Sequence, residues 1–302
     1  MDSTIAPFQH ILVVLDASED FAIPLTRASQ MCKLMDAKMS VLISCFAVLS
    51  VKNKSALNDD LGDMVDQLRE DVKEQLEQLK TVELLDKTFL SWQEKTSLAT
   101  QRLIEDRKFD LVIKAPVQQG EFKKLFRSGL DKYFVSDCPL PVWMIKPREW
   151  DQDIQVMACI DMADKAHENV LMNKHILSIS DRLTGLLGGH MHVTDCFYGE
   201  IGSMRVDYNS KRGFKRQASV KEQHLEQLKS YIHDYSLMDD QLHFEEGIPD
   251  DVIPSRAAAL GAELVVIGNN EDSNIFDRIM GDTAVTLTQA MPCDILILKL
   301  NN

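Results

Sequence analysis

The stretch Ile11-Leu12-Val13-Val14-Leu15-Asp16 has a counterpart in the same chain, because a related stretch, Val156–Asp161, follows 145 positions later. Each is a run of five apolar residues that ends on an aspartate. Short apolar runs bounded by turn signals predict buried strands. Two strands that finish on the same carboxylate suggest that one unit occurs twice in the chain.

Three more landmarks repeat in the same order, which indicates a tandem duplication. We therefore expect two domains, residues 1–149 and 150–302, with a short junction near Pro147–Asp151 that favours packing of the two halves. The matching pairs are Ser44–Phe46 with Asp195–Phe197, Asp110–Ile113 with Glu263–Val266, and Cys138–Lys146 with Cys293–Lys299.

Within each half, predicted strands alternate with helical patterns. Apolar residues recur every three or four positions through Leu61–Leu79 and through Leu225–Ile232, and a further helix runs from about His167 to Gly188. Strands alternating with amphipathic helices are typical of a parallel sheet covered on both faces. The predicted fold class is α/β, Rossmann-like.

Composition excludes several kinds of protein. The chain has 302 residues, of which 45% are hydrophobic, enough for two ordinary cores. A formal charge of −14 and a pI near 5.0 argue against nucleic acid and anionic membranes as partners. Six scattered cysteines without CxxC spacing are typical of a reducing compartment. With neither a signal peptide nor a membrane-spanning run in the sequence, we expect a cytoplasmic protein.

The chain resembles the universal stress protein family, and its tandem E-type members in particular. The resemblance rests on the opening Ile11–Ser18, on Gly268 followed by Gly281, on the ending Cys293–Ile297, and on Cys138–Lys146 for the subgroup. It implies that each half is a five-stranded parallel sheet of order 3-2-1-4-5 and that the halves pair as an intramolecular pseudo-dimer. The apolar last strands would cover each other's edges, and a homodimer of the tandem chain stays open.

In ATP-binding members of that family, a loop with three glycines and a Ser or Thr lets backbone N–H groups approach phosphates. The second half keeps Gly268 and Gly281 but has Glu271 at the middle glycine and Asp282 at the hydroxyl position, with Thr283 one place late. Two carboxylates beside a triphosphate would be repulsive. We therefore expect no useful ATP binding, although Gly268, Gly281 and Thr283 stay candidate ligand residues.

The first half departs further, with Ala115, Gln118 and Ser128 at the three glycine positions. We expect the neighbouring Lys114 to extend to water, with contact to an anion as the alternative.

Asp16 and Asp161 correspond to the aspartate that lies near the base and ribose in nucleotide-binding relatives, at the sheet edge where such folds bind ligands. Equally, each carboxylate could cap the turn that follows it. Both interpretations stay open.

Three histidines form a candidate zinc site. His190 and His192 lie on one face of a predicted strand and His243 lies in the next strand, so the three imidazoles could converge, with Glu245 or water as a fourth ligand. The simpler interpretation is polar residues on a partly exposed sheet edge.

No catalytic motif is present in the sequence, so we expect no enzyme. The basic run Lys211–Arg216 could attract an anionic head group or be a solvated loop. The resemblance implies a bacterial protein that supports survival of starvation and DNA damage by binding a small molecule or a stress-pathway protein. The alternatives are an ATP-binding switch in the second half and a binding module for a lipid-like molecule or zinc.

Overall fold

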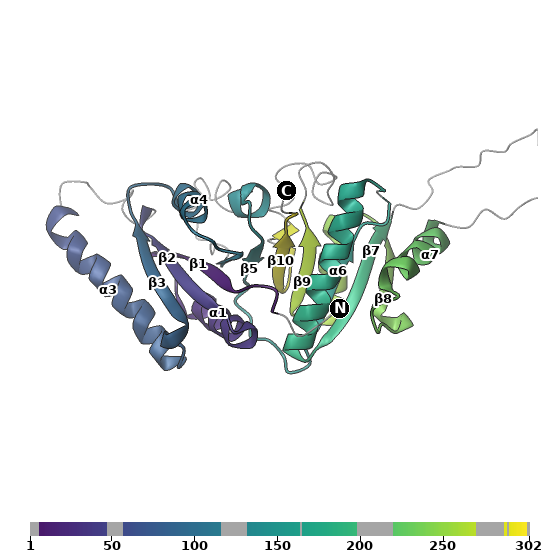
Figure 1. The fold of residues 1–302 in the computed structure, drawn as a ribbon, viewed down its shortest axis with the longest axis horizontal. Helices are drawn as coiled ribbons and strands as arrows, with labels where there is room; N and C mark the ends of the chain where they lie inside the picture. Colours follow the sequence, from purple (N-terminus) through teal and green to yellow (C-terminus); the bar gives the residue numbers. More distant parts are fainter. Residues whose placement is uncertain are drawn as a thin grey trace, which may run out of the picture.

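The structure is a computed structural model that describes residues 6–46, 57–115, 132–163, 165–197, 220–269, 287–288 and 290–300. Figure 1 shows an elongated molecule in which the first half of the chain lies on one side and the second half on the other.

Both halves alternate strands and helices, as the sequence predicts. The first half contains β1 (His10–Asp16), α1 (Ala22–Met35), β2 (Lys38–Ser44), α3 (Leu57–Gln78), a 3₁₀ turn (Val82–Leu84), β3 (Leu85–Ser91), α4 (Thr96–Asp106), β4 (Leu111–Lys114), a π-helical turn (Tyr133–Asp137) and β5 (Val142–Met144). The second half contains β6 (Gln155–Ile160), α6 (His167–Leu187), β7 (His190–Phe197), α7 (Val220–Ile232), a 3₁₀ turn (Asp239–Gln241), β8 (Leu242–Glu246), α8 (Pro249–Leu260), β9 (Leu264–Gly268) and β10 (Asp294–Leu298).

The strands form one ten-stranded sheet of order β3-β2-β1-β4-β5-β10-β9-β6-β7-β8. Each half therefore has the expected order 3-2-1-4-5. Strands are parallel within each half, and β5 meets β10 in an antiparallel pair in which Trp143 lies opposite Leu296. This pair confirms that the last strands of the two halves cover each other.

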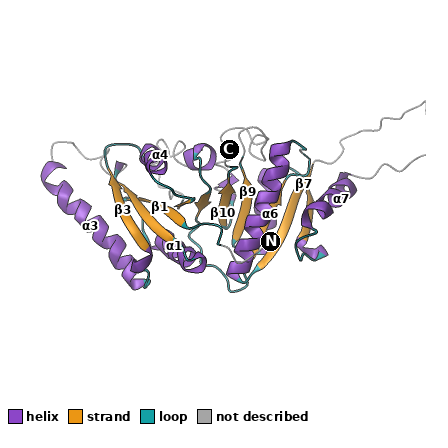
Figure 2. Cartoon of the chain, viewed as in Figure 1, coloured by secondary structure: helices purple, strands orange, loops and turns teal. Residues whose placement is uncertain are grey.

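Helices lie alongside the strands of the sheet (Figure 2), and buried apolar side chains form two layers, one on each face of the sheet. Ile11 and Val13 pack in the layer that contains buried residues of α1 and α6. Leu12 and Val14, which alternate with them, pack in the other layer, with residues of α4 and α8. Because successive side chains of a strand point to opposite faces, strands buried on both faces are apolar throughout, which explains the runs that the sequence shows.

Helix ends are fixed by residues in the left-handed conformation. Gly188 ends α6 with φ of 65° and donates its N–H to the carbonyl of Thr184, as expected for a glycine at a helix C-terminus.

Between the halves, the junction around Pro147–Asp151 forms neither helix nor strand. No helix in the described ranges combines the length and apolarity needed to cross a bilayer.

Candidate functional site

The carboxyl ends of the first-half strands carry a cluster of buried polar side chains. Asp16 ends β1, and its Oδ1 accepts hydrogen bonds from the backbone N–H (2.9 Å) and hydroxyl (2.6 Å) of Ser18. At the end of β2, the Ser44 hydroxyl lies 2.7 Å from the hydroxyl of Thr96, which begins α4. For Asp16 the structure therefore shows the turn-capping role that the sequence left open.

Lys114 corrects one expectation. It ends β4, its residue is only 1% exposed, and its Nζ donates to the carbonyl of Ala115 at 2.7 Å. The Nζ also lies 3.8 Å from a carboxylate oxygen of Glu19, in the loop after β1. The prediction that Lys114 extends to water was wrong, because the neighbouring carboxylate and carbonyl receive its charge inside the protein.

The second half uses its aspartate in the same way. Asp161 follows β6, and its Oδ1 accepts the backbone N–H of Ala163 at 2.8 Å. From α6, the side-chain amides of Asn169 and Asn173 each donate to the Asp161 carbonyl at 2.8 Å. A further carboxylate, that of Asp195 in β7, accepts the backbone N–H of Met162 at 3.1 Å. This edge of the second half is thus built around two buried carboxylates.

Gly268 ends β9 beneath α6, and the packing of α6 explains why this residue is a glycine. A Cβ at this position would lie 2.6 Å from the Sδ of Met172 and 3.2 Å from Ile176 Cδ1. Its φ lies outside the left-handed range, so close approach of α6 is the structural reason for glycine here. Gly281 and Thr283, its expected partners in a ligand loop, lie outside the described residues, as do Gln118, Ser128, Glu271, Asp282 and Lys211–Arg216.

The next residues of the second half reach across the seam between the halves. The side-chain amide of Asn269 donates to the carbonyl of Val135 at 2.7 Å. Lys299, after β10, donates through Nζ to the carbonyl of Ser136 at 2.8 Å. Both acceptors belong to the π-helical turn that precedes β5, so the ligand edge of the second half contacts the first half where β5 begins. Sequence analysis missed these contacts, because a backbone carbonyl leaves no mark in the sequence.

Only two of the three candidate zinc ligands come together. Nδ1 of His192 lies 3.0 Å from Nε2 of His243, and Nε2 of His192 lies 2.9 Å from the side-chain oxygen of Gln155. His190 is 59% exposed at its side chain and lies 3.2 Å from Asp153 instead. Within the described ranges no three His, Cys, Asp or Glu side chains are grouped to hold a metal ion.

The environment of the histidine pair favours neutral imidazoles. Burial, together with the neighbouring His192 and Arg256, lowers the pKa of His243 to about 4. Burial likewise lowers the pKa of His192. Because Gln155 presents an oxygen to Nε2 of His192, the Nδ1 of His192 accepts the proton of His243 Nε2, and the pair is satisfied without a metal.

Free thiols do not supply a nucleophile. All six cysteines are free, and burial raises the pKa of Cys32 and of Cys196 to about 12. A thiol with a raised pKa stays protonated at neutral pH and is a weak nucleophile.

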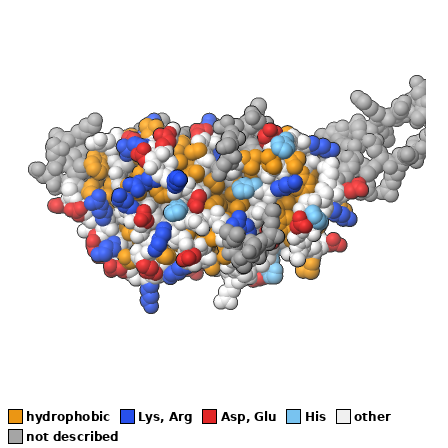
Figure 3. All heavy atoms as spheres, viewed as in Figure 1, with side chains coloured by type: hydrophobic (Ala, Val, Ile, Leu, Met, Phe, Trp, Pro, Cys, Tyr) orange, Lys and Arg blue, Asp and Glu red, His pale blue; other side chains and the backbone are white. Residues whose placement is uncertain are grey.

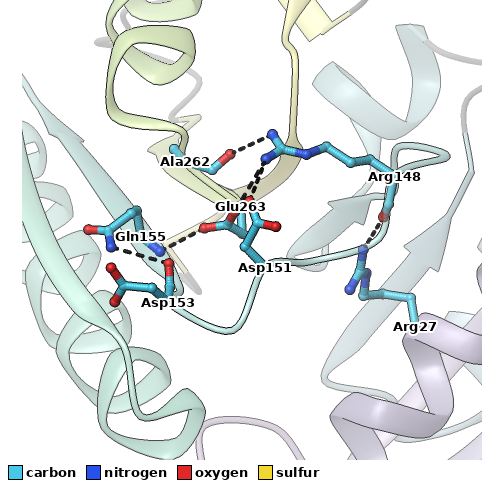
Figure 4. Close-up of polar contacts among 7 residues, drawn as sticks. All are labelled: Arg27, Arg148, Asp151, Asp153, Gln155, Ala262 and Glu263. Atoms are coloured by element: carbon cyan, nitrogen blue, oxygen red, sulfur yellow. Dashed lines mark hydrogen bonds and ion pairs between the residues drawn. The ribbon is translucent and has the colours of Figure 1, made fainter.

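An ionic network fills the junction between the halves (Figure 4). The Nε of Arg27 lies 2.9 Å from Oδ2 of Asp294, and Arg27 donates to the carbonyl of Arg148 at 2.8 Å. Arg148 in turn lies 3.4 Å from Glu263, whose other carboxylate oxygen accepts the backbone N–H of Gln155 at 2.7 Å. Arg27, Asp294, Arg148 and Glu263 were missed by sequence analysis, since their partners lie in the other half or in the junction.

Comparison with known proteins identifies this class of structure. Residues 188–299 match the model of the Universal stress protein family. The chain is 22% identical over 304 residues to the Universal stress protein E homolog of Haemophilus influenzae, covering 97% of both chains. It is 21% identical over 302 residues to Universal stress protein E of Escherichia coli K12, covering 97% of this chain and 95% of that protein.

Solved structures share the fold along the whole chain. A putative universal stress protein from Pseudomonas aeruginosa UCBPP-PA14 gives a TM-score of 0.67 at 21% identity, covering 97% of this chain and 94% of that one. A universal stress protein from Archaeoglobus fulgidus gives a TM-score of 0.59 at 15% identity, with coverage of 96% and 97%.

The fold is therefore that of tandem universal stress proteins. The match to the Universal stress protein family model lies in the second half, over residues 188–299, and the chain is similar over nearly its entire length to the E-type tandem proteins. The resemblance drawn from the sequence is confirmed.

Proposed function

We propose that this stress-related protein acts by binding a small molecule or a protein partner and not by catalysis. The observation that carries the proposal is the filled ligand edge of the first half, where Asp16, Lys114 and Thr96 are engaged by the protein's own groups. Open α/β sheets bind ligands at this edge. Here a nucleotide would have to replace buried internal hydrogen bonds and a buried charge contact, which is unfavourable.

The second half offers a poor phosphate cradle for a different reason. Asp161 and Asp195 place two buried carboxylates at its ligand edge. Two unit charges about 4 Å apart near a protein surface repel by about 4 kcal/mol, so bringing a triphosphate to such an edge requires compensating cations. The carboxylates Glu271 and Asp282 in the expected ligand loop add to the same charge.

The absence of turnover is part of the proposal. Buried thiols of high pKa and a neutral histidine pair engaged with Gln155 leave no activated nucleophile among these groups. The proposal also sets the domain limits at 1–149 and 150–302 and the location in the cytoplasm. It further includes a role in surviving starvation and DNA damage.

An ATP-dependent switch in the second half is the alternative, and one observation favours it. The second half keeps Gly268 and Asp161 at positions that match the ligand residues of ATP-binding relatives, whereas the first half has Ala115 in place of the first glycine. A switch would place all nucleotide contacts in one domain.

Native mass spectrometry of the purified full-length protein tests the proposal. Small molecules and metals that stay bound would be released and identified, with nucleotide, lipid and zinc measured separately. We expect no stoichiometric ATP or ADP. A nucleotide at one equivalent, lost in an Asp161→Ala variant and retained in Asp16→Ala, would replace the proposal by the switch. In cells, a deletion strain that survives starvation and ultraviolet light as well as its parent would contradict the stress role.

A further inference from the structure

We propose that the first half binds a small phosphate monoester at the opposite end of its sheet, where the strands begin. A hollow of roughly 280 Å³ lies there. Its lining combines cations, one carboxylate, one hydroxyl and one aromatic ring; the residues are His10, Ile11, Lys38, Met39, Ser40, Asp86, Arg107, Lys108 and Phe109. Ligand pockets begin near this volume, so the site fits a small molecule.

This hollow is separate from the family's ligand edge. His10 begins β1 and Asp16 ends it, and a strand rises about 3.3 Å per residue. The two sites therefore lie on the order of 20 Å apart, at opposite ends of the same strand.

Backbone contacts hold the hollow in shape without a ligand. The carboxylate of Asp110 accepts the backbone N–H groups of Gln9 (2.8 Å) and His10 (3.0 Å), which ties the loop before β4 to the start of β1. On the other side, Met39 lies opposite Leu85 and Ser40 lies opposite Lys87. Asp86 is therefore the extra residue of a β-bulge, a feature that redirects a side chain.

Among the described residues, no carboxylate forms an ion pair with the cations that line the hollow. Lys38, Arg107 and Lys108 make no ion pair within the described part of the chain. Lys38 donates to the backbone carbonyl of Glu83 at 2.7 Å, and the guanidinium of Arg107 lies 4.8 Å from the ring centre of Phe89. In a protein with a formal charge of −14, unpaired cations around one hollow favour an anion.

Charge in the surrounding surface supports the same ligand class. Most of the Lys and Arg residues lie in the first half of the sequence, which is close to neutral, so the net negative charge comes mainly from the second half. On the face drawn in Figure 3, Lys and Arg side chains gather over the side that holds the first half.

Ser40 adds a hydrogen-bonding group to the wall of the hollow. The residue is 4% exposed and lines the hollow, and its hydroxyl makes no hydrogen bond to any residue that the structure describes. The hydroxyl is therefore open to the hollow and can donate a hydrogen bond to a ligand atom.

The mixture of groups defines the ligand. Arg and Lys recognise phosphate oxygens through charge-assisted hydrogen bonds. The exposed carboxylate of Asp86 is an acceptor for hydroxyl groups, and Phe109 supplies apolar contact. A phosphorylated polyol or sugar of about the size of ribose 5-phosphate has a phosphate for the cations and hydroxyl groups for Asp86.

A titration of the full-length protein followed by amide chemical shifts in two-dimensional NMR tests this site. Three probes are used at about 150 mM salt, where unspecific surface attraction is screened: ribose 5-phosphate, inorganic phosphate and ribose. We expect saturable shifts at Ser40, Arg107 and Phe109 with ribose 5-phosphate, weaker binding of inorganic phosphate, and no saturation with ribose.

Two charge-matched variants complete the test. Arg107→Gln should weaken binding of ribose 5-phosphate about tenfold, the loss expected for one charge-assisted hydrogen bond. Arg102→Gln, on α4 and paired with Glu94 at 2.6 Å outside the hollow, should change it less than about twofold. Ser40→Ala should weaken binding while both circular dichroism and the melting temperature stay unchanged. Absence of saturable shifts at about 10 mM ribose 5-phosphate, or equal weakening in both arginine variants, overturns the site.

Discussion

The Nε of Arg27 lies 2.9 Å from Oδ2 of Asp294, so a cation on α1 of the first half is paired with the carboxylate that begins β10 of the second half. The side chains are only 5% and 1% exposed. The same carboxylate accepts the backbone N–H of Lys146 at 2.8 Å and the indole N–H of Trp143 at 3.2 Å. The guanidinium also lies 3.9 Å from the ring centre of Trp150. One buried ion pair thus joins both halves and the junction.

Removal of Arg27 should strongly destabilise the protein. Arg27→Met leaves the buried Asp294 carboxylate without its cation, which typically costs about 3 to 5 kcal/mol. Urea unfolding of the full-length protein measures the loss. The control is Arg69→Met on α3, because Arg69 is 53% exposed and lies 3.8 Å from Asp66. That variant should differ from wild type by less than about 1 kcal/mol, and equal effects of the two substitutions would contradict the role of Arg27.

The same carboxylate predicts a pH dependence of stability. Burial raises the pKa of Asp294 to about 6 from its usual value of 3.8, despite the neighbouring Arg27. Between about pH 4 and 6 the folded protein therefore holds this proton more readily than the unfolded chain does. The contribution of Asp294 to folding stability should rise as the pH falls from 7 towards 4. Asp294→Asn cannot titrate, so wild type should gain stability relative to this variant between pH 7 and pH 5. An unchanged difference in urea unfolding would refute the shift.

Gly268 should be required for packing. Gly268→Ala places a methyl group against Met172 and Ile176 of α6, and overpacking of a core typically costs about 1 to 3 kcal/mol. Thermal unfolding measures the effect. Gly185 is a matched control within α6, since a Cβ there meets nothing within 4 Å; Gly185→Ala should leave stability unchanged or raise it. A neutral Gly268→Ala would remove the packing explanation.

Separated halves should not be stable monomers. The antiparallel β5–β10 pair and the Arg27–Asp294 ion pair both disappear when residues 1–149 and 150–302 are expressed alone. Each half then exposes an apolar edge strand that can pair with another chain. Light scattering across a dilution series should show self-association or aggregation. Two monomers at every concentration, with melting temperatures equal to that of the intact protein, would mean that the halves are independent.

The fold could be predicted from the sequence because its strands are buried on both faces. Their apolar runs, such as Ile11–Leu15, stand out without knowledge of their neighbours, and the duplication fixes their order twice. The helix end at Gly188 could be predicted equally well, since a glycine after a helical pattern is a local signal.

The contacts between the halves were harder to predict from the sequence. Arg27 and Asp294 are ordinary surface types in sequence, and only the fold brings them together. Lys114 was misjudged because lysines at strand ends usually reach water, and its acceptor Glu19 lies in another loop. The three histidines share the expected region, but the register places His243 beside His192 and leaves His190 near Asp153.

Isothermal titration of the intact protein with Mg-ATP measures whether the protein binds its partner without using a nucleotide site. We predict no saturable heat up to about 1 mM ATP, because the first half's edge is filled by its own side chains and the second half's edge carries Asp161 and Asp195. One micromolar site that disappears in Asp161→Ala and persists in Asp16→Ala would contradict the claim and establish an ATP switch in the second half.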